Sequence, residues 1–84
     1  MMQADTIKQL IAQGLATTEI LVEGDDGTHF QAIVVSDEFA GKSAVQQHQL
    51  VYKTLGSKMG TEIHALALQT YTPEQWAANR ALNG

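Results

Sequence analysis

Two histidines, His29 and His64, are the side chains of this sequence whose chemistry is most suggestive. Each stands near the beginning of a segment with the composition of a β-strand, "THFQAIVVS" at 28–36 and "EIHALALQTY" at 62–71. Imidazole nitrogen is a common ligand of transition metals, and it replaces thiolate on one iron of some [2Fe–2S] clusters. If the fold brings both rings together, they supply half of the ligands of a metal or iron–sulfur centre, with the other half coming from elsewhere.

A purely structural role is the alternative for both histidines. His29 is then only a residue of a β-hairpin, and His64 is a partly buried strand residue whose ring is hydrogen-bonded. In support of this alternative, His64 has the same strand parity as Leu66 and Leu68. The positions of the two histidines in the sequence do not by themselves decide between the two roles.

The composition limits the classes of protein to consider. The 84 residues have the length of one domain, so we expect a single domain over residues 1–84. There is no cysteine, which excludes disulfides, thiol nucleophiles and a self-contained thiolate metal site. The net charge of −4 argues against a general nucleic-acid-binding surface, which is usually basic. The sequence has neither the apolar core of a signal peptide nor an apolar run of membrane-spanning length, so we expect a cytoplasmic protein.

The first part of the chain predicts a helix followed by a β-hairpin. The helix has an apolar stripe at i, i+3 and i+4 spacing, formed by Ile7, Leu10 and Ile11. Asp5 or Thr6 is the predicted N-cap. Segments rich in β-branched residues on both sides of "DDG" predict a hairpin over residues 18–36, with Asp26 and Gly27 in the positive-φ positions of its turn.

A second helix follows the hairpin. Ser43 and Gln46 have the spacing of a capping box at its beginning, and Gly56 is a natural C-terminal end. Its predicted apolar stripe consists of Ala44, His48, Val51 and Leu55. Val45 and Tyr52 flank this stripe, and we expect His48 to pack rather than react.

The last elements are a short helical turn at 57–60, a strand at 62–71 and a final helix. Thr72 as N-cap and Pro73 at the first position mark the beginning of that helix, and Trp76 is expected to anchor it to the sheet. A helix-containing connection between the second and third strands makes them parallel if they pair. The sequence therefore predicts an α+β fold with a three-stranded mixed sheet and helices on one face, and it predicts that His29 and His64 lie at one rim of that sheet.

Three other motifs are weaker matches to known sites. "GKS" at 41–43 lacks the glycine that a phosphate-binding loop needs five residues earlier, where this chain has Ser36. "GDDG" at 24–27 has the G-x-x-G pattern of KH domains, but it lies in a hairpin and its acidic residues repel phosphate. Asp37 and Glu38 are adjacent acids for which we expect solvation rather than catalysis. No serine, histidine and acid have the spacing of a nucleophilic triad, so no enzymatic activity is expected.

The segments "FAGKSAVQQHQLVYKTLG" and "IHALALQTYTPEQW" resemble the BolA family. "GTHF" in the hairpin and the "NRALNG" tail extend the resemblance over nearly the whole chain, and it is greatest to the short bacterial IbaG branch. The resemblance implies the order α-β-β-α-α-β-α and a fold similar to a class II KH domain, in agreement with the elements above. It also implies a partner, a monothiol glutaredoxin, with which BolA proteins bridge a [2Fe–2S] cluster.

In the complex that this resemblance implies, the glutaredoxin cysteine and glutathione supply the thiolates. The BolA side supplies a histidine that matches His64, and a histidine or cysteine of the loop between the first two strands, which His29 matches. The expected function is that of a non-enzymatic iron–sulfur adaptor in cluster trafficking or sensing. We expect the chain alone to bind no cofactor and to be a monomer or a weak homodimer. Imidazole ligands predict a cluster that is more oxidising and more easily released in acid than an all-thiolate one.

A nucleic-acid-binding regulator is the alternative function, because some BolA proteins are described as stress-linked transcription regulators that contact DNA. The resemblance assigns the DNA contacts to a loop and the helix after it, at Phe39, Gly41, Lys42, Ser43, Lys53 and Lys58. This helix carries glutamine at 46, 47 and 49, where strong phosphate contact needs basic side chains. The sequence therefore favours the adaptor.

Overall fold

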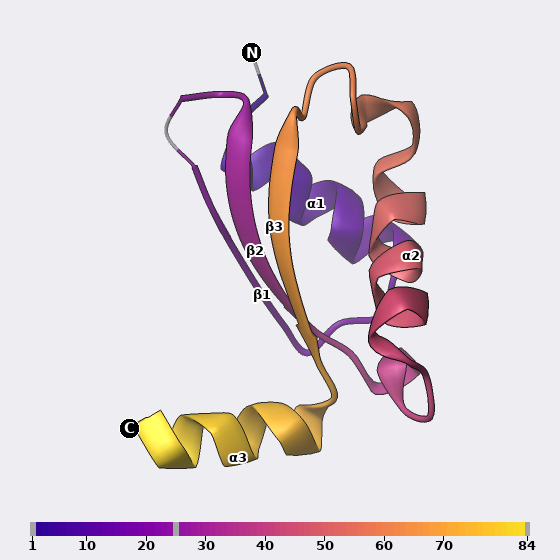
Figure 1. Cartoon of the computed structure of the whole chain (residues 1–84), viewed down its shortest axis with the longest axis vertical. Helices are drawn as coiled ribbons and strands as arrows, with labels where there is room; N and C mark the ends of the chain where they lie inside the picture. The colour runs from indigo at the N-terminus through magenta and orange to yellow at the C-terminus, as the bar shows by residue number, and fades with distance from the viewer. Residues whose placement is uncertain (1, 25, 84) are drawn as a thin grey trace.

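The computed structural model describes residues 2–24 and 26–83, which form a mixed β-sheet with helices (Figure 1). The elements in chain order are α1 (Ala4–Gly14), β1 (Glu19–Glu23), β2 (His29–Val35), the 3-10 helix η1 (Asp37–Phe39), α2 (Ala44–Leu55), the 3-10 helix η2 (Gly56–Lys58), β3 (Ala65–Tyr71) and α3 (Pro73–Asn83). The predicted α+β class and the order of its elements are confirmed.

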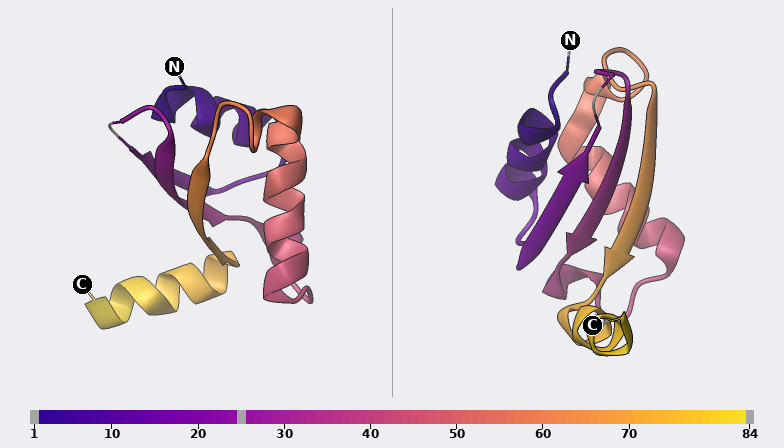
Figure 2. Two further views of the ribbon diagram at one scale, coloured as in Figure 1. Left: turned by 45° about the horizontal axis from the view of Figure 1, so that its top comes forward. Right: turned by 90° about the vertical axis from the view of Figure 1, so that its left-hand side faces the viewer.

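The sheet has the strand order β1-β2-β3, with β2 in the centre. β1 and β2 are antiparallel, as in the predicted hairpin, and β2 and β3 are parallel, with His29 opposite Ala65 and Val35 opposite Tyr71. Both parallel strands therefore begin at the same end of the sheet, where the hairpin turn and the segment before β3 lie side by side (Figures 1 and 2).

The hydrophobic core lies between the sheet and the two helices α1 and α2. β2 alternates between exposed and buried side chains along its first four residues, as expected for a strand with one face toward a core. The buried members of the core include Ile7, Ile11, Leu15, Ile20, Phe30, Val34, Val35, Phe39, Val51, Leu55 and Ile63.

Helix α3 departs from the prediction that the helices cover one face of the sheet. It lies beyond the end of β3, apart from α1 and α2, as the two views of Figure 2 show. Only Thr72 separates β3 from α3, so the helix begins directly where the strand ends. Trp76 still anchors it, because its ring packs against Tyr71 of β3 with the ring centroids 5.4 Å apart. Thr72 caps the helix as predicted.

The beginnings of α1 and β2 correct two predictions from the sequence. α1 starts at Ala4 with Gln3 as N-cap, so Asp5 lies inside the helix, where its carboxylate accepts a hydrogen bond from Gln9 (3.1 Å). Among the described residues only glycines have positive φ, and Gly27 with φ 80° is the one in the hairpin turn. Asp26 does not adopt the predicted left-handed conformation. Asp25, the other acid of "GDDG", lies outside the described residues.

Helix α2 has the predicted ends but a different buried face. The capping box of Ser43 and Gln46 is present, and Gly56 ends the helix with φ 56°. The buried residues are Gln47, Val51 and Leu55, whereas the predicted stripe residue Ala44 is exposed. His48 is half-buried and lies edge-on to the exposed ring of Tyr52, with the ring centroids 6.4 Å apart.

Gln47 is buried because its amide finds partners in two other segments. It donates to the carbonyl oxygens of Phe39 (3.2 Å) and Lys42 (3.0 Å), and it accepts from the hydroxyl of Thr70 in β3 (2.6 Å). These bonds offset the cost of removing a polar side chain from water. They join α2 to β3 and to the loop before α2.

Candidate metal centre

The backbones of His29 and His64 are neighbours at the start of the parallel strands. The amide of His64 donates to the carbonyl oxygen of Thr28 (2.9 Å), and the amide of Ala65 donates to the same oxygen (3.2 Å). His29 is the register partner of Ala65. We call this part of the molecule the histidine rim, and it consists of Asp26, Thr28, His29, His64 and Ala65. The placement of the two histidines at one rim is as the sequence predicts.

Both histidine side chains are exposed to solvent. The side chain of His29 is 65% exposed, and His64 also belongs to the exposed residues. The interpretation of His64 as a partly buried strand residue is therefore wrong. β3 begins only at Ala65, because residues 59–64 form a turn in which Ile63, fully buried, bridges to Met59. His64 lies between this buried residue and the strand, and its ring is free to face a second molecule.

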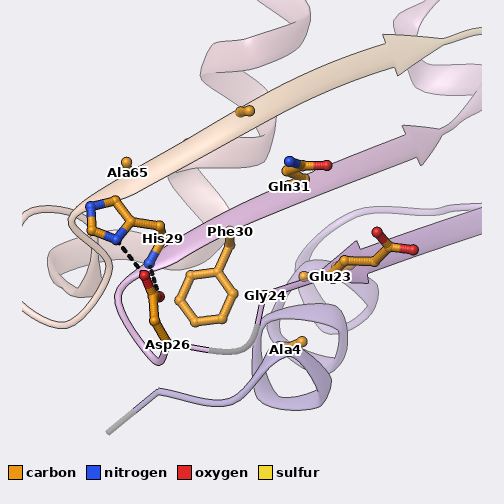
Figure 3. A pocket seen from close by; sticks show the side chains of 10 residues that line it. Ala4, Glu23, Gly24, Asp26, His29, Phe30, Gln31 and Ala65 are labelled. Atoms are coloured by element: carbon orange, nitrogen blue, oxygen red, sulfur yellow. Dashed lines mark hydrogen bonds and ion pairs between the residues drawn. The ribbon is translucent and has the colours of Figure 1, made fainter.

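Asp26 binds His29 through both of its carboxylate oxygens. Oδ1 accepts hydrogen bonds from the backbone amides of His29 (2.8 Å) and Thr28 (2.9 Å), and Oδ2 lies 2.7 Å from Nδ1 of the His29 ring (Figure 3). These donors, the His29 amide first, hold the pKa of the Asp26 carboxyl well below its usual range. From the sequence, Asp26 is predicted only as a turn residue. The D-x-x-H spacing across a tight turn is the signal that was missed.

An open hollow of about 820 Å³ lies beside the histidine rim, and Figure 3 shows it from close by. Its lining comes from α1 and all three strands, and includes Ala4, Glu23, Gly24, His29, Gln31 and Ala65. Gly24 permits a close approach of the two hairpin strands, since a β-carbon there would meet the ring of Phe30 at 2.5 Å. Within the described ranges no group of three or more histidine, aspartate or glutamate side chains has the arrangement of a metal site.

The six residues assigned to DNA contact are not all brought together. Lys42 and Lys53 line one surface hollow of about 480 Å³ together with Gly41. Phe39 is fully buried in the core and has no surface to offer a ligand. The remaining two residues are engaged elsewhere: the Ser43 hydroxyl caps α2, and Lys58 forms an ion pair with Glu62 (3.2 Å).

The adjacent acids Asp37 and Glu38 differ in their surroundings. Asp37 is exposed, as expected for a solvated carboxylate. Glu38 is exposed too, but its Oε2 accepts a hydrogen bond from the backbone amide of Ala16 (2.8 Å), so it joins η1 to the segment before β1. This contact gives Glu38 a structural partner that the sequence did not predict.

In the described part of the chain, no helix has the length and apolar character needed to cross a membrane.

Comparison with known proteins identifies the family. The protein-family model described as BolA-like protein matches residues 9–75, which include both histidines of the rim and most of the fold. The chain belongs to the BolA family. The resemblance seen in the sequence is thereby confirmed, and with it the BolA-like architecture.

Three BolA-family relatives illustrate how far the likeness extends. The acid stress protein IbaG of Escherichia coli strain K12 is 39% identical over 84 residues, covering 99% of this chain and 99% of IbaG. A BolA protein homologue from Coxiella burnetii has a structure with TM-score 0.81 and 45% identity, covering 92% of this chain and 99% of that one. The DNA-binding transcriptional regulator BolA of Escherichia coli strain K12 is 43% identical over 49 residues, 58% of this chain and 47% of the regulator.

Proposed function

We propose that this BolA-family chain is a non-enzymatic iron–sulfur adaptor of the cytoplasm, which shares a [2Fe–2S] cluster with a monothiol glutaredoxin through His64 and His29. The observation that carries the proposal is the histidine rim. Two exposed histidines, His29 at the first residue of β2 and His64 directly before β3, have neighbouring backbones in a chain without cysteine. Neutral nitrogen donors of this kind suit an iron that has sulfur ligands from another molecule.

The residues of the rim have separate tasks in this proposal. His64 offers one ring nitrogen, and its backbone is fixed by the bond to Thr28. His29 offers the second ring nitrogen, and the Asp26 carboxylate holds the ring through its Nδ1 atom. The thiolates come from the glutaredoxin cysteine and from glutathione, because this chain has none. When bound, the cluster supplies a redox-active and transferable iron centre.

The name of one relative agrees with a role in stress. Escherichia coli IbaG, similar over almost its full length, is named an acid stress protein. An imidazole ligand can be protonated in the range where cytoplasmic acidification occurs, whereas a metal-bound thiolate holds its metal to lower pH. Imidazole ligation would thus allow the cluster to be released or transferred during acid stress.

Reconstitution with a glutaredoxin tests the proposal. The chain is mixed with a monothiol glutaredoxin, glutathione, iron and sulfide, and the visible circular dichroism is compared with that of the glutaredoxin homodimer. We expect a new spectrum with the wild-type chain and with His48→Ala, which removes a histidine of α2 outside the rim. His64→Ala should abolish the new spectrum. A wild-type mixture indistinguishable from the glutaredoxin homodimer would refute the proposal.

DNA binding is the second candidate, favoured by two observations. The regulator BolA, a DNA-binding protein by name, is similar to this chain over 49 residues, and Lys42 and Lys53 share one surface hollow. If this function holds, duplex DNA binds with an affinity that falls steeply with salt, and Lys42→Gln or Lys53→Gln weakens the binding for all sequences alike. Binding too weak to measure at low salt would exclude this candidate.

A further inference from the structure

We propose that Asp26 is a positioning residue for His29, which fixes the ring in the tautomer that presents Nε2 to a metal. This inference rests on the proposed function and deepens it, because it assigns the ligating atom of His29 and the residue that selects it. The juxtaposition that carries it is the short contact between Oδ2 of Asp26 and Nδ1 of His29, 2.7 Å across the hairpin turn.

The two oxygens of the Asp26 carboxylate divide their work. Oδ1 is occupied by the backbone amides of Thr28 and His29, and this anchors the side chain in the turn. Oδ2 is left to face the ring, and an ionised carboxylate can only accept a hydrogen bond. Nδ1 must therefore carry the hydrogen, and the lone pair of the neutral ring is then on Nε2.

The surroundings of the ring support this assignment. The Thr28 hydroxyl donates to Oδ1 of Asp26 (3.4 Å), so its oxygen, 2.9 Å from the same Nδ1, can accept a hydrogen bond from the ring. The other ring nitrogen points away from Asp26, as Figure 3 shows. The Asp26 side chain is also exposed to solvent, where a carboxylate is ordinarily ionised at the pH of the cell.

An oriented imidazole is a better ligand than a freely exchanging one. A carboxylate that accepts the second N–H of a ligating histidine fixes its tautomer and raises the basicity of the ligating nitrogen. Loss of such a partner typically lowers metal affinity by about 10–100-fold. Asp26 would thus give the exposed ring of His29, at the first residue of β2, a single tautomer with Nε2 ready to bind metal before the partner binds.

Asp26→Asn tests the inference with little change of shape. The amide oxygen of asparagine can keep the two backbone donors that Oδ1 binds. Its NH₂ group then takes the place of Oδ2 and is a donor, so Nδ1 must become the acceptor and the hydrogen must move to Nε2. Asp37→Asn is the matched control, because it removes the same charge from an exposed position at the other end of β2.

The first measurement uses the free chain and does not depend on any cluster. Long-range ¹H–¹⁵N spectra of the histidine rings distinguish protonated from unprotonated ring nitrogens. Recorded well above the ordinary imidazole pKa of about 6.5, they should show the Nδ1–H tautomer of His29 in the wild type and in Asp37→Asn. Asp26→Asn should show the Nε2–H tautomer. A wild-type ring with its hydrogen on Nε2 overturns the inference, even if Asp26→Asn does not fold.

The second measurement joins the tautomer to metal binding. In the mixture with glutaredoxin, glutathione, iron and sulfide, Asp26→Asn should need about 10–100-fold more chain than wild type to form the mixed cluster, and Asp37→Asn should behave as wild type. If Asp26→Asn reverses the tautomer but titrates like wild type, the positioning role is refuted while the proposed function stands. If the wild-type chain forms no mixed cluster, the proposed function fails, and the ring spectra still report separately on the hydrogen bond.

Discussion

Replacement of Gly24 by alanine should destabilise the hairpin that carries His29. The new β-carbon would lie 2.5 Å from Cδ1 of Phe30 and 2.7 Å from the backbone oxygen of His29, whereas ordinary contacts lie at 3.4–4 Å. The Phe30 side chain is only 3% exposed, so it cannot swing into solvent. The oxygen of His29 belongs to the backbone of β2, and it cannot move unless the strand moves with it.

The size of this effect follows from two opposing contributions. Overpacking of a well-packed core typically costs about 1–3 kcal/mol. Alanine also restricts the unfolded chain, which stabilises the protein by about 0.4–1 kcal/mol. We therefore expect the free energy of unfolding to fall by about 1–2 kcal/mol in urea denaturation. Because β2 is displaced at His29, the Gly24→Ala chain should also form the mixed cluster less readily.

A double-mutant cycle separates the clash with Phe30 from other effects of the alanine. Phe30→Val removes the ring atoms that the β-carbon would meet. In this background Gly24→Ala should cost about 1 kcal/mol less than in the wild type, since contacting residues couple by about 0.5–3 kcal/mol. Equal costs in both backgrounds would show that the clash with Phe30 contributes little, and a Gly24→Ala chain as stable as wild type would refute the predicted overpacking.

Three further substitutions probe the fold and the turn. Gln47→Leu removes the hydrogen bonds that join α2 to β3 and to the loop before α2, so the free energy of unfolding should fall by about 1–3 kcal/mol. The control Gln49→Leu, at an exposed position of α2, should change that free energy by less than about 0.5 kcal/mol. Equal effects of the two substitutions would contradict the role of Gln47. Ser43→Ala removes the N-cap of α2 and should cost about 1 kcal/mol in urea denaturation, and no loss would refute the capping role. The folded-state pKa of Asp26 is depressed, so its carboxylate stabilises the fold above its ordinary pKa and this contribution is lost as the pH falls. The stability difference between wild type and Asp26→Ala should therefore shrink from about pH 5 to about pH 2, and a constant difference would be contrary to this reasoning.

The elements and the sheet could be predicted because their signals are local or follow from general topology. Capping residues define the ends of α2, and a glycine-containing turn defines the hairpin. A helical connection makes β2 and β3 parallel, and this rule alone brings His29 beside the residues that precede β3. The burial of Gln47 could not be predicted, because its partners Phe39, Lys42 and Thr70 lie in segments whose contact depends on the finished fold.

The site was predictable in outline but not in detail. The two histidines were identified by residue type and by strand position. The exposure of His64 depends on a turn at residues 59–64 that shortens β3, and strand parity gave the wrong expectation there. The contact of Asp26 with His29 depends on the conformation of the turn. Asp26 has no positive φ there, and its side chain accepts from the backbone amide of His29 and contacts the ring.

Hyperfine spectroscopy of the reduced mixed cluster tests the central claim most directly. The chain is labelled with ¹⁵N in its histidine rings, mixed with unlabelled glutaredoxin and glutathione, and studied by pulsed electron paramagnetic resonance. We predict nitrogen couplings from the label in the wild type and in His48→Ala, and no such couplings in His64→Ala, which should form no mixed cluster. A mixed complex whose cluster has no coupling to labelled nitrogen would contradict the claim that imidazoles of this chain bind the iron.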